Sequence, residues 1–497
     1  MTLQQLEALE ETKLLYENKD IKLKISQLSQ NRRQFMLGAT AAIFAPSIHA
    51  LAQNTNISPD GFFELTAKKT TASLLGIDKL QTPVWGYNGT NPGPLIRVKQ
   101  GETVKVRLIN ELDQATTIHW HGIRIDNKMD GVTGLTQAAV EPGESFDYEF
   151  IAPDAGTYWY HTHNRTWEQL ARGLYGMLIV EEPDAPDYKE INLILDDWRL
   201  AQDGTIDEES LGELLDWAHD GRIGNILTAN GQSKPEFEVK AGERLRLRIV
   251  NVANSLIMNL NIPNHDPWVI ALDGHPIEPR KLQKEDLVLA PAQRIDLVID
   301  ANLQPGEVSP IEFVTRDKKI TLATLKYNNE IIKQNTTTAP AALPISMPHN
   351  AFNLAAAKTV ELNITGGAMG TMRQAMLGGK MLNWQELVKA KRVWAFNGIA
   401  GDMDKPLIRV KQGETVRIDM INDTAFPHAM HLHGTHFTVV GRNNKPIEQR
   451  VWRDTELIYP DEKLSFAFLA DNLGKWIFHC HMIEHQAGGM MTWIEVV

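Results

Sequence analysis

Most of the chain consists of short runs in which hydrophobic and polar residues alternate, separated by Gly, Pro and Asn. The runs 105–110 and 417–422 are clear examples. A period of two is typical of β-strands that bury one face, so the pattern predicts antiparallel β-sandwiches or barrels. Helical periodicity is sparse. It is clearest over Ile206 to Ala218 and over Asn383 to Ala390, which we interpret as insertions on the sandwich frame.

A long repeat organises the chain. The sequence PLIRVKQGETV occupies 94–104 and recurs letter for letter at 406–416. An Asn-Gly pair precedes each copy and an alternating run follows it, and a weaker third copy covers 230–251. Self-similarity in a fixed order at long spacing indicates repeated domains rather than a short-period solenoid.

The length of 497 residues fits two to four domains. Together with the repeat, it predicts three domains at 53–184, 185–335 and 336–497. A stretch rich in Thr, Ala and Pro at 335–350 reads as the linker into the last domain.

The first 52 residues read as an export signal. Arg32 and Arg33 precede an alanine-rich apolar run that ends near Ile48, and Ala50 and Ala52 form an Ala-x-Ala cleavage signature. This order predicts recognition by the twin-arginine translocase and a mature protein that begins near residue 53. The apolar run is too short and too broken to span a bilayer, so we expect no stable membrane anchor. The protein should therefore work in the periplasm or outside the cell.

Composition excludes several functions. A hydrophobic content of 43% and a charged content of 23% are those of a globular protein. The net charge of -12 offers no basic surface for nucleic acid, whereas cationic substrates, metal ions included, are tolerated. The single cysteine, Cys480, excludes an intramolecular disulfide.

Ten of the 16 histidines fall into four clusters. In a strand, residues i and i+2 face the same way, so each His-x-His pair directs two imidazoles to one locus. One such pair is a weak signal, but two in the first domain and two in the last indicate a shared metal site, and eight imidazoles suit three copper ions with open positions for oxygen. The clusters are His119-Trp120-His121-Gly122, Tyr160-His161-Thr162-His163, His428-Ala429-Met430-His431-Leu432-His433-Gly434, and His479-Cys480-His481 followed by His485 and Met490.

Cys480 predicts a second kind of site. On a strand its side chain faces opposite to His479 and His481, so its thiolate belongs to a different metal. A thiolate, two imidazoles and a weak thioether define a blue-copper electron-transfer site, and Cys480 with His428, His485 and Met490 supplies this set. The flanking peptides form a short covalent path between the two sites.

The motifs HWHG, HTH, HxxHxH and HCHxxxHxxxxM resemble those of the multicopper oxidases, which include laccases, ascorbate oxidase, ceruloplasmin and bacterial copper-efflux oxidases. The resemblance covers essentially the whole mature chain. It implies an all-β fold of three cupredoxin-like Greek-key β-sandwich domains, of which the middle one holds no copper. Residues 185–335 contain only His219, His265 and His275, which we interpret as structural.

The resemblance also implies four copper ions and a role for each ligand. Asp130 matches the family's carboxylate near the type 2 copper and is expected to act in proton delivery. Gln486 stands where efflux-type members have a proton-relaying glutamate, and an amide cannot donate a proton as an acid, so the relay route stays open, as does a role for Glu484. The implied ligands are His428, Cys480, His485 and axial Met490 for type 1, His119 and His431 for type 2, and His121, His161, His163, His433, His479 and His481 for the type 3 pair.

The electron donor is left open by the sequence. Met369, Met372, Met376 and Met381 lie in a glycine-rich segment, and thioethers suit Cu(I), with Met372 and Met376 one turn apart if the segment is helical. The alternative is that they are gap-filling methionines. By family analogy, axial Met490 implies a modest potential and donors such as Cu(I), Fe(II) or electron-rich phenols.

We expect phenols to deliver electrons to the exposed edge of a type 1 histidine, with dioxygen as the acceptor. We expect a monomer that serves copper tolerance. The alternative function is a periplasmic copper-sequestering protein without turnover. Copper nitrite reductases are disfavoured, because their catalytic site is a single copper that needs no His-Cys-His bridge.

Overall fold

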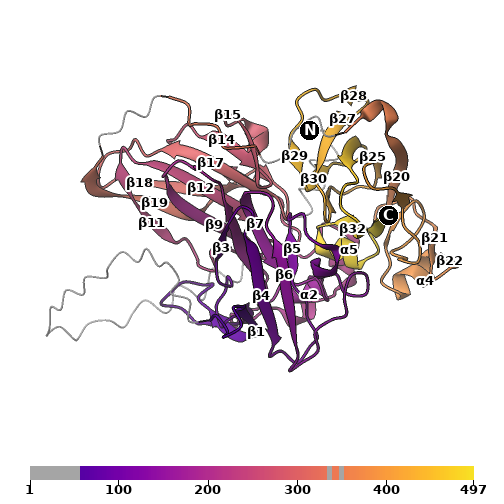
Figure 1. Ribbon diagram of the computed structural model, residues 1–497. Coiled ribbons are helices and arrows are strands. Elements are labelled where there is room, and N and C mark those ends of the chain that lie inside the picture. Colours follow the sequence, from indigo (N-terminus) through magenta and orange to yellow (C-terminus); the bar gives the residue numbers. More distant parts are fainter. Residues whose placement is uncertain (1–55, 333–337, 346–351) are drawn as a thin grey trace. The chain divides into compact units, whose positions relative to one another are not determined.

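The structure, a computed structural model, describes residues 56–332, 338–345 and 352–497. The predicted export signal lies outside these residues. Strands dominate the described residues and form three β-sandwiches in succession along the chain (Figure 1). The prediction of an all-β fold of three sandwiches is therefore confirmed. Every helix in the described ranges is too short or too polar to cross a lipid bilayer.

The first sandwich pairs two four-stranded sheets. Strand β4 (Thr103–Asn110) shows why the alternating runs form strands, since Val104, Val106 and Leu108 are buried in the core and their neighbours are more exposed. In sheet order the strands are β2 (Thr82–Tyr87), β1 (Phe63–Ala72), β4 and β6 (Ser145–Ile151), against β3 (Ile96–Lys99), β8 (Tyr175–Glu181), β7 (Gly156–His161) and β5 (His119–His121).

The middle sandwich has its own hydrophobic core, which includes Leu247, Leu297 and Leu325. Its six-stranded sheet contains β10 (Ile226–Ala229), β9 (Lys189–Trp198), β12 (Arg244–Asn251), β17 (Arg294–Asp300), β14 (Trp268–Leu272) and β15 (His275–Lys281). Its five-stranded sheet contains β11 (Glu236–Ala241), β19 (Lys319–Ile331), β18 (Val308–Val314), β13 (Met258–Asn261) and β16 (Val288–Leu289).

The third sandwich carries a separate hairpin of β21 (Gln374–Leu377) and β22 (Lys380–Asn383). Its larger sheet contains β23 (Trp394–Phe396), β20 (Lys358–Gly366), β25 (Thr415–Asp423), β31 (Lys463–Leu469), β27 (Phe437–Arg442), β28 (Lys445–Pro446) and β29 (Trp452–Arg453). The facing sheet contains β24 (Ile408–Val410), β33 (Met491–Val496), β32 (Gly474–Cys480), β26 (His428–Leu432) and β30 (Thr455–Ile458).

Each copy of the repeated sequence forms the same two strands: β3 and β4, β11 and β12, or β24 and β25. The first strand of each pair lies parallel to β8, β19 or β33, and the second lies parallel to β1, β9 or β20. These parallel pairs depart from the antiparallel prediction. They arise because the chain crosses from one sheet to the other between successive strands, which local alternation does not report.

The two predicted helices have different outcomes. The segment 206–218 forms only η4 (Glu208–Ser210) and α3 (Leu214–Ala218), separated by Gly212 at a φ of +76°. The segment 383–390 forms α4 (Trp384–Lys389), capped by Asn383. The described residues also contain η3 (Asn127–Met129), α2 (Thr166–Gln169), η5 (Lys284–Leu287), η6 (Leu354–Ala356) and α5 (Ile483–Ala487).

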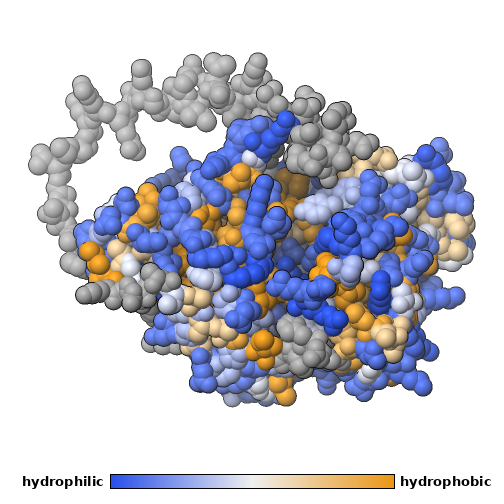
Figure 2. Space-filling model, turned by 90° about the horizontal axis from the view of Figure 1, so that it is seen from above, coloured by the Kyte–Doolittle hydropathy of each residue, from blue (hydrophilic) through white to orange (hydrophobic). Residues whose placement is uncertain are grey.

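The cores of the first and third sandwiches are continuous. One cluster of buried hydrophobic residues contains Trp120 from the first sandwich and Trp394 and Cys480 from the third. The histidine-bearing strands of both sandwiches therefore meet at a shared boundary. On the face drawn in Figure 2, polar residues predominate and hydrophobic residues are scattered among them.

Candidate metal centres

The thiolate site, defined as the predicted residues His428, Cys480, His485 and Met490, brings the ligand atoms of the first three together. His428 begins β26, Cys480 ends β32, and His485 lies in α5. Cys480 Sγ lies 3.8 Å from Nδ1 of each histidine, and the two Nδ1 atoms are 3.0 Å apart. All four side chains are fully buried. The fold therefore brings a thiol and two imidazole nitrogens to one dry locus.

The other ring nitrogens of the two histidines are already committed as donors. His485 Nε2 donates to the His219 carbonyl oxygen at 2.6 Å. His428 Nε2 lies 2.9 Å from Thr424 Oγ1, whose own hydrogen goes to Asn422 Oδ1 at 2.7 Å, so the imidazole is the donor. Both Nδ1 atoms are therefore bare, and their lone pairs face each other. A soft cation satisfies this arrangement.

The backbone of Met490 ties the site together. Its N–H donates to the His485 carbonyl at 2.9 Å, and its carbonyl accepts from the Cys480 N–H at 3.1 Å. Burial raises the pKa of the Cys480 thiol to about 12. Without a metal the group is thus a neutral thiol, and a metal that binds the thiolate must displace its proton.

Neither imidazole of the thiolate site has an exposed edge. The expectation that phenols deliver electrons to the exposed edge of a type 1 histidine is therefore wrong. His428 and His485 are both 0% exposed. Trp394 packs against the two rings at centroid distances of 5.1 and 4.5 Å, and its Nε1 donates to the Trp217 carbonyl of the middle sandwich. The segment after α3, which belongs to the middle sandwich, covers His485 through the His219 carbonyl. The sequence pattern around His485 does not report this contact, because its two residues are far apart along the chain.

The histidine cluster, defined as the eight remaining predicted ligands, lies where the first and third sandwiches meet. Strand register pairs His119 with His161 and His431 with His479. Across the boundary, the ring of His121 stacks on that of His431 at 3.8 Å, and the ring of His119 stacks on that of His433 at 3.7 Å. The cluster comprises His119, His121, His161, His163, His431, His433, His479 and His481, all buried.

Six of the eight imidazoles donate one ring N–H to a protein oxygen, which fixes their tautomer. The opposite nitrogens of His119, His121, His161 and His431 have no partner among the described residues, and those of His433 and His479 face each other at 3.1 Å. The donors are His119 Nδ1 to Asp130 O (2.9 Å), His121 Nε2 to Asp454 Oδ1 (3.1 Å), His161 Nδ1 to Thr162 O (2.8 Å), His431 Nδ1 to Asp454 O (2.8 Å), His433 Nδ1 to Asp130 Oδ2 (3.0 Å) and His479 Nδ1 to Cys480 O (2.9 Å).

Burial favours the neutral form of three of these imidazoles. Burial and, next, the neighbouring imidazoles lower the pKa of His433 and His479 well below the ordinary value, and that of His163 to about 3. Ligand atoms of His163, His433 and His479 lie within 4.8 Å of one another, as do those of His119, His431 and His433. Neutral imidazoles with bare, converging nitrogens are the donor set that copper requires.

Asp130 contacts two histidines of the cluster. It is fully buried after η3, and its carboxylate accepts from His433 Nδ1 and lies 3.2 Å from His119 Nδ1. Gln486 is buried in α5. Glu484 accepts from Asn254 Nδ2 at 2.8 Å and Ser255 Oγ at 2.7 Å, so both of its oxygens are engaged by the middle sandwich.

One residue that contacts the histidine cluster is marked by no sequence pattern. Asp454, between β29 and β30, holds His121 by its carboxylate and His431 by its carbonyl. No motif or period marks it, because its partners are distant along the chain. Among the described residues, His265 and His275 belong to no candidate metal group, and His219 contributes only its carbonyl.

Family profiles described as multicopper oxidase match three parts of the chain, residues 66–185, 189–330 and 373–497. The chain is 30% identical over 448 residues to the multicopper oxidase MmcO of Mycobacterium tuberculosis, covering 83% of this chain and 82% of that protein. It is 25% identical to copper resistance protein A of Pseudomonas syringae pv. tomato, covering 94% and 99% of the two chains.

Solved structures show the same relationship. A multicopper oxidase from Pseudomonas thermotolerans superposes with a TM-score of 0.75 at 34% identity, covering 88% of this chain and 98% of that one. A multicopper oxidase from Campylobacter jejuni, described as a metallo-oxidase, has a TM-score of 0.73 at 29% identity and covers 90% and 93%.

Proposed function

The chain belongs to the multicopper oxidase family, and from this premise we propose that it couples the oxidation of a reducing substrate at the thiolate site to the reduction of dioxygen at the histidine cluster. Four one-electron oxidations balance the reaction of one O₂ and four protons to two waters. The observation that carries the proposal is the set of bare, converging imidazole nitrogens, joined to the thiolate site by the His479-Cys480-His481 segment.

We assign four copper ions, one at the thiolate site and three in the histidine cluster. Bound there, copper supplies one-electron redox chemistry at the first site and dioxygen reduction at the second. Type 1 takes His428, Cys480, His485 and Met490, type 2 takes His119 and His431, and type 3 takes His121, His161, His163, His433, His479 and His481.

Electrons reach the thiolate site through protein atoms, because its imidazoles are covered. His485 Nε2 contacts the His219 carbonyl at 2.6 Å, and His219 is partly exposed after α3. We propose this hydrogen bond as the route by which a donor on the surface reduces the site. Onward transfer follows the peptides from Cys480 to His479 and His481, which the chain makes continuous.

Protons are proposed to reach the cluster at Asp130. Its carboxylate is within hydrogen-bonding distance of ligands of both assigned kinds, His119 and His433. A carboxylate can accept and release a proton at the point where oxygen is reduced. Gln486 can hold water but cannot act as an acid, so we assign proton delivery to Asp130.

Cuprous ion is the favoured donor, and copper tolerance in the periplasm the favoured role, after export of the chain by the twin-arginine route. Relatives named copper resistance protein A and metallo-oxidase support this choice. In the hairpin, Met376 lies opposite Met381. Met376 also forms a β-bridge with Ile399, and its carbonyl accepts from the Ala400 N–H. Ala400 in turn lies against Gly489, the residue before Met490. Two thioethers thus lie on a hairpin linked to the thiolate site.

Oxygen uptake separates this function from copper sequestration. The copper-loaded protein should show an intense blue band and consume oxygen catalytically with Cu(I) or a phenol, one O₂ for four electrons. Cys480→Ser should abolish the band and the turnover while the protein stays folded, because serine is close to cysteine in size and the change removes only the sulfur ligand. His265→Gln, in the middle sandwich, is the control and should keep both. Copper binding without sustained oxygen uptake would make the protein a sequestering one.

A further inference from the structure

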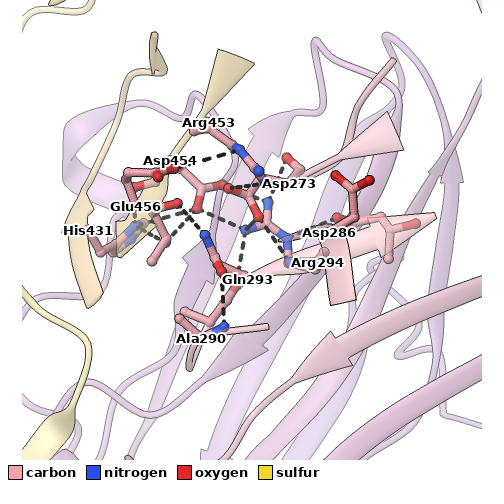
Figure 3. Close-up of polar contacts among 12 residues, drawn as sticks. Asp273, Asp286, Ala290, Gln293, Arg294, His431, Arg453, Asp454 and Glu456 are labelled. Carbon is pink, nitrogen blue, oxygen red and sulfur yellow. Dashed lines mark hydrogen bonds and ion pairs between the residues drawn. The ribbon is translucent and has the colours of Figure 1, made fainter. Parts of the chain in front are cut away.

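One arginine of the middle sandwich reaches the histidine cluster. Arg294 begins β17 and is fully buried. Its guanidinium forms a two-pronged ion pair with Asp454 of the third sandwich, Nη1 to Oδ1 at 2.8 Å and Nη2 to Oδ2 at 2.6 Å (Figure 3). This planar fork matches a carboxylate and fixes its plane as well as its position.

The opposite side of Asp454 touches two candidate copper ligands. Its Oδ1 accepts from His121 Nε2 at 3.1 Å, and its carbonyl accepts from His431 Nδ1 at 2.8 Å. The nitrogens left bare are His121 Nδ1 and His431 Nε2. The orientation of Asp454 therefore determines which nitrogen of His121 is free and where the stacked pair of rings points.

All five N–H groups of the guanidinium have acceptors. Beyond the two bonds to Asp454, Nε donates to the Thr157 carbonyl of the first sandwich at 3.2 Å, Nη2 to the Asp273 carbonyl at 2.9 Å and Nη1 to the Ala292 carbonyl at 3.2 Å. One side chain thus joins all three sandwiches. A lysine ammonium has three donors and no fork, so it cannot reproduce the set.

The neighbouring residue reinforces the same link. Gln293 Nε2 donates to the Thr455 carbonyl at 3.0 Å, while its Oε1 accepts from the Ala290 N–H at 2.9 Å (Figure 3). Gln293 and Arg294 therefore bind consecutive residues of the third sandwich. On the far side, Arg453 lies 3.5 Å from Asp273, which completes a row of alternating charges.

The glycine of the HWHG motif is explained by the same ion pair. A Cβ at Gly122 would lie 2.4 Å from Arg294 Nη2 and 2.6 Å from Asp454 Oδ2, and its φ of +84° disfavours other residues. The motif therefore provides both ligands and the space in which the arginine meets the aspartate.

We infer that Arg294 is a positioning residue for the histidine cluster, contributed by the sandwich that holds none of its ligands. It holds Asp454, and through Asp454 it orients His121 and His431. This inference rests on the proposed function, since it concerns how the oxygen-reducing centre is kept in shape. Buried ion pairs add little net stability compared with apolar residues, so the geometry that the pair imposes accounts better for its role.

The test uses the copper-loaded, full-length protein and Arg294→Lys, with Arg246→Lys as the matched control. Arg246 is equally buried in the middle sandwich, but its ion pairs are with Glu182 and Asp296. Arg294→Lys should keep the blue band, change the type 2 electron paramagnetic resonance spectrum, and lower cluster copper occupancy or oxygen turnover about 10- to 100-fold. Arg246→Lys should leave the spectrum unchanged.

Two results would overturn the inference: a wild-type type 2 spectrum and turnover in Arg294→Lys, or equal changes in both variants, which would indicate general domain docking. If Arg294→Lys does not fold, the double variant Arg294→Gln with Asp454→Asn removes both buried charges together and should still alter the type 2 spectrum. A wild-type protein without blue colour or oxygen uptake would refute the proposed function instead. The wild-type band and oxygen uptake are therefore measured before any variant is made.

Discussion

At the scale of single residues, the site depends on which nitrogen of each imidazole is left bare. A carbonyl oxygen can only accept, so the carbonyls beside His161, His431 and His479 leave the far nitrogen without a proton. Aspartate carboxylates do the same for His121 and His433. The protein thus prepares neutral ligands in a dry site before any metal binds.

Asp130→Asn should separate proton delivery from metal binding. The amide oxygen can still accept from His433 Nδ1, so copper content and the blue band should stay normal. Turnover should fall, most clearly toward high pH where protons are scarce, because the titrating carboxylate is lost. The measurement is the pH profile of oxygen uptake beside a copper assay. Wild-type turnover across the whole range would remove Asp130 from the mechanism.

The copper-free protein should lose stability as pH falls through the histidine range. His163 has an ordinary pKa of 6.5, lowered to about 3 in the fold. Below pH 6.5, His163 therefore binds a proton in the unfolded chain but not in the folded one. Between pH 6.5 and pH 3 this difference should lower the free energy of unfolding by about 1.4 kcal/mol per pH unit. This cost is absent above the unfolded pKa of 6.5 and is complete below the folded pKa of about 3.

The comparison is between wild type and His163→Gln, which removes this titration. From pH 6 to pH 5, the unfolding free energy of the copper-free variant should fall by about 1 kcal/mol less than that of the wild type. Urea denaturation at each pH measures it. Equal slopes for the two proteins would contradict a neutral, buried His163.

At the scale of elements, much of the site was predictable. The i, i+2 rule predicts that His119 and His121 lie together and that Cys480 lies apart from His479. The candidate metal groups divide in this way, since the division depends on local geometry alone. The turns at the Asn-Gly pairs were also predictable, because this pair favours tight turns. Positive φ angles are found at Asn88, Asn230 and Asn397, which begin these turns.

What could not be predicted depends on contacts between distant segments. The pairing of Arg294 with Asp454 spans three domains, and the cover over His485 comes from the segment after α3. The methionine segment shows the same limit. Met372 and Met376 would lie one turn apart only in a helical segment. Instead, Met376 lies in strand β21 of a hairpin, because Gly378 and Gly379 at positive φ turn the chain back, and Met372 precedes that strand.

The hairpin also sharpens the test of Cu(I) docking. Met376 and Met381 are cross-strand partners, whereas Met372 is buried and its sulfur accepts from Thr365 Oγ1. Met376→Leu with Met381→Leu should lower Cu(I) oxidation several-fold and leave phenol oxidation unchanged, since Leu–Met exchange costs little stability. Met372→Leu is the control. Equal loss with both substrates would mean that the hairpin is only structural.

At the scale of the whole molecule, the middle sandwich acts as a brace, that is, it links the first and third sandwiches, although it holds none of the assigned ligands. Its strand β12 alternates arginine with apolar residues, a pattern whose charged side normally faces water. Here Arg246 and Arg248 are buried against Asp296, and Arg246 also pairs with Glu182, which follows the last strand of the first sandwich. Thr157, on the strand that carries His161, donates to the same aspartate at 2.8 Å.

Asp296→Ala should therefore destabilise the molecule as a unit. It leaves two buried guanidinium groups without their shared carboxylate, a loss of about 3–5 kcal/mol. Asp147→Ala is the control, because Asp147 pairs with Arg107 while 43% exposed, and such a pair contributes less than about 1 kcal/mol. Chemical denaturation of the copper-free proteins, followed by tryptophan fluorescence, gives both midpoints. The first and third sandwiches should unfold together with the middle one. Thr157 of the first sandwich donates to Asp296, and Arg294 donates both to the Thr157 carbonyl and to Asp454 of the third sandwich. Loss of the middle sandwich alone, with the rest unfolding at the wild-type midpoint, would show that it is an appended domain rather than a brace.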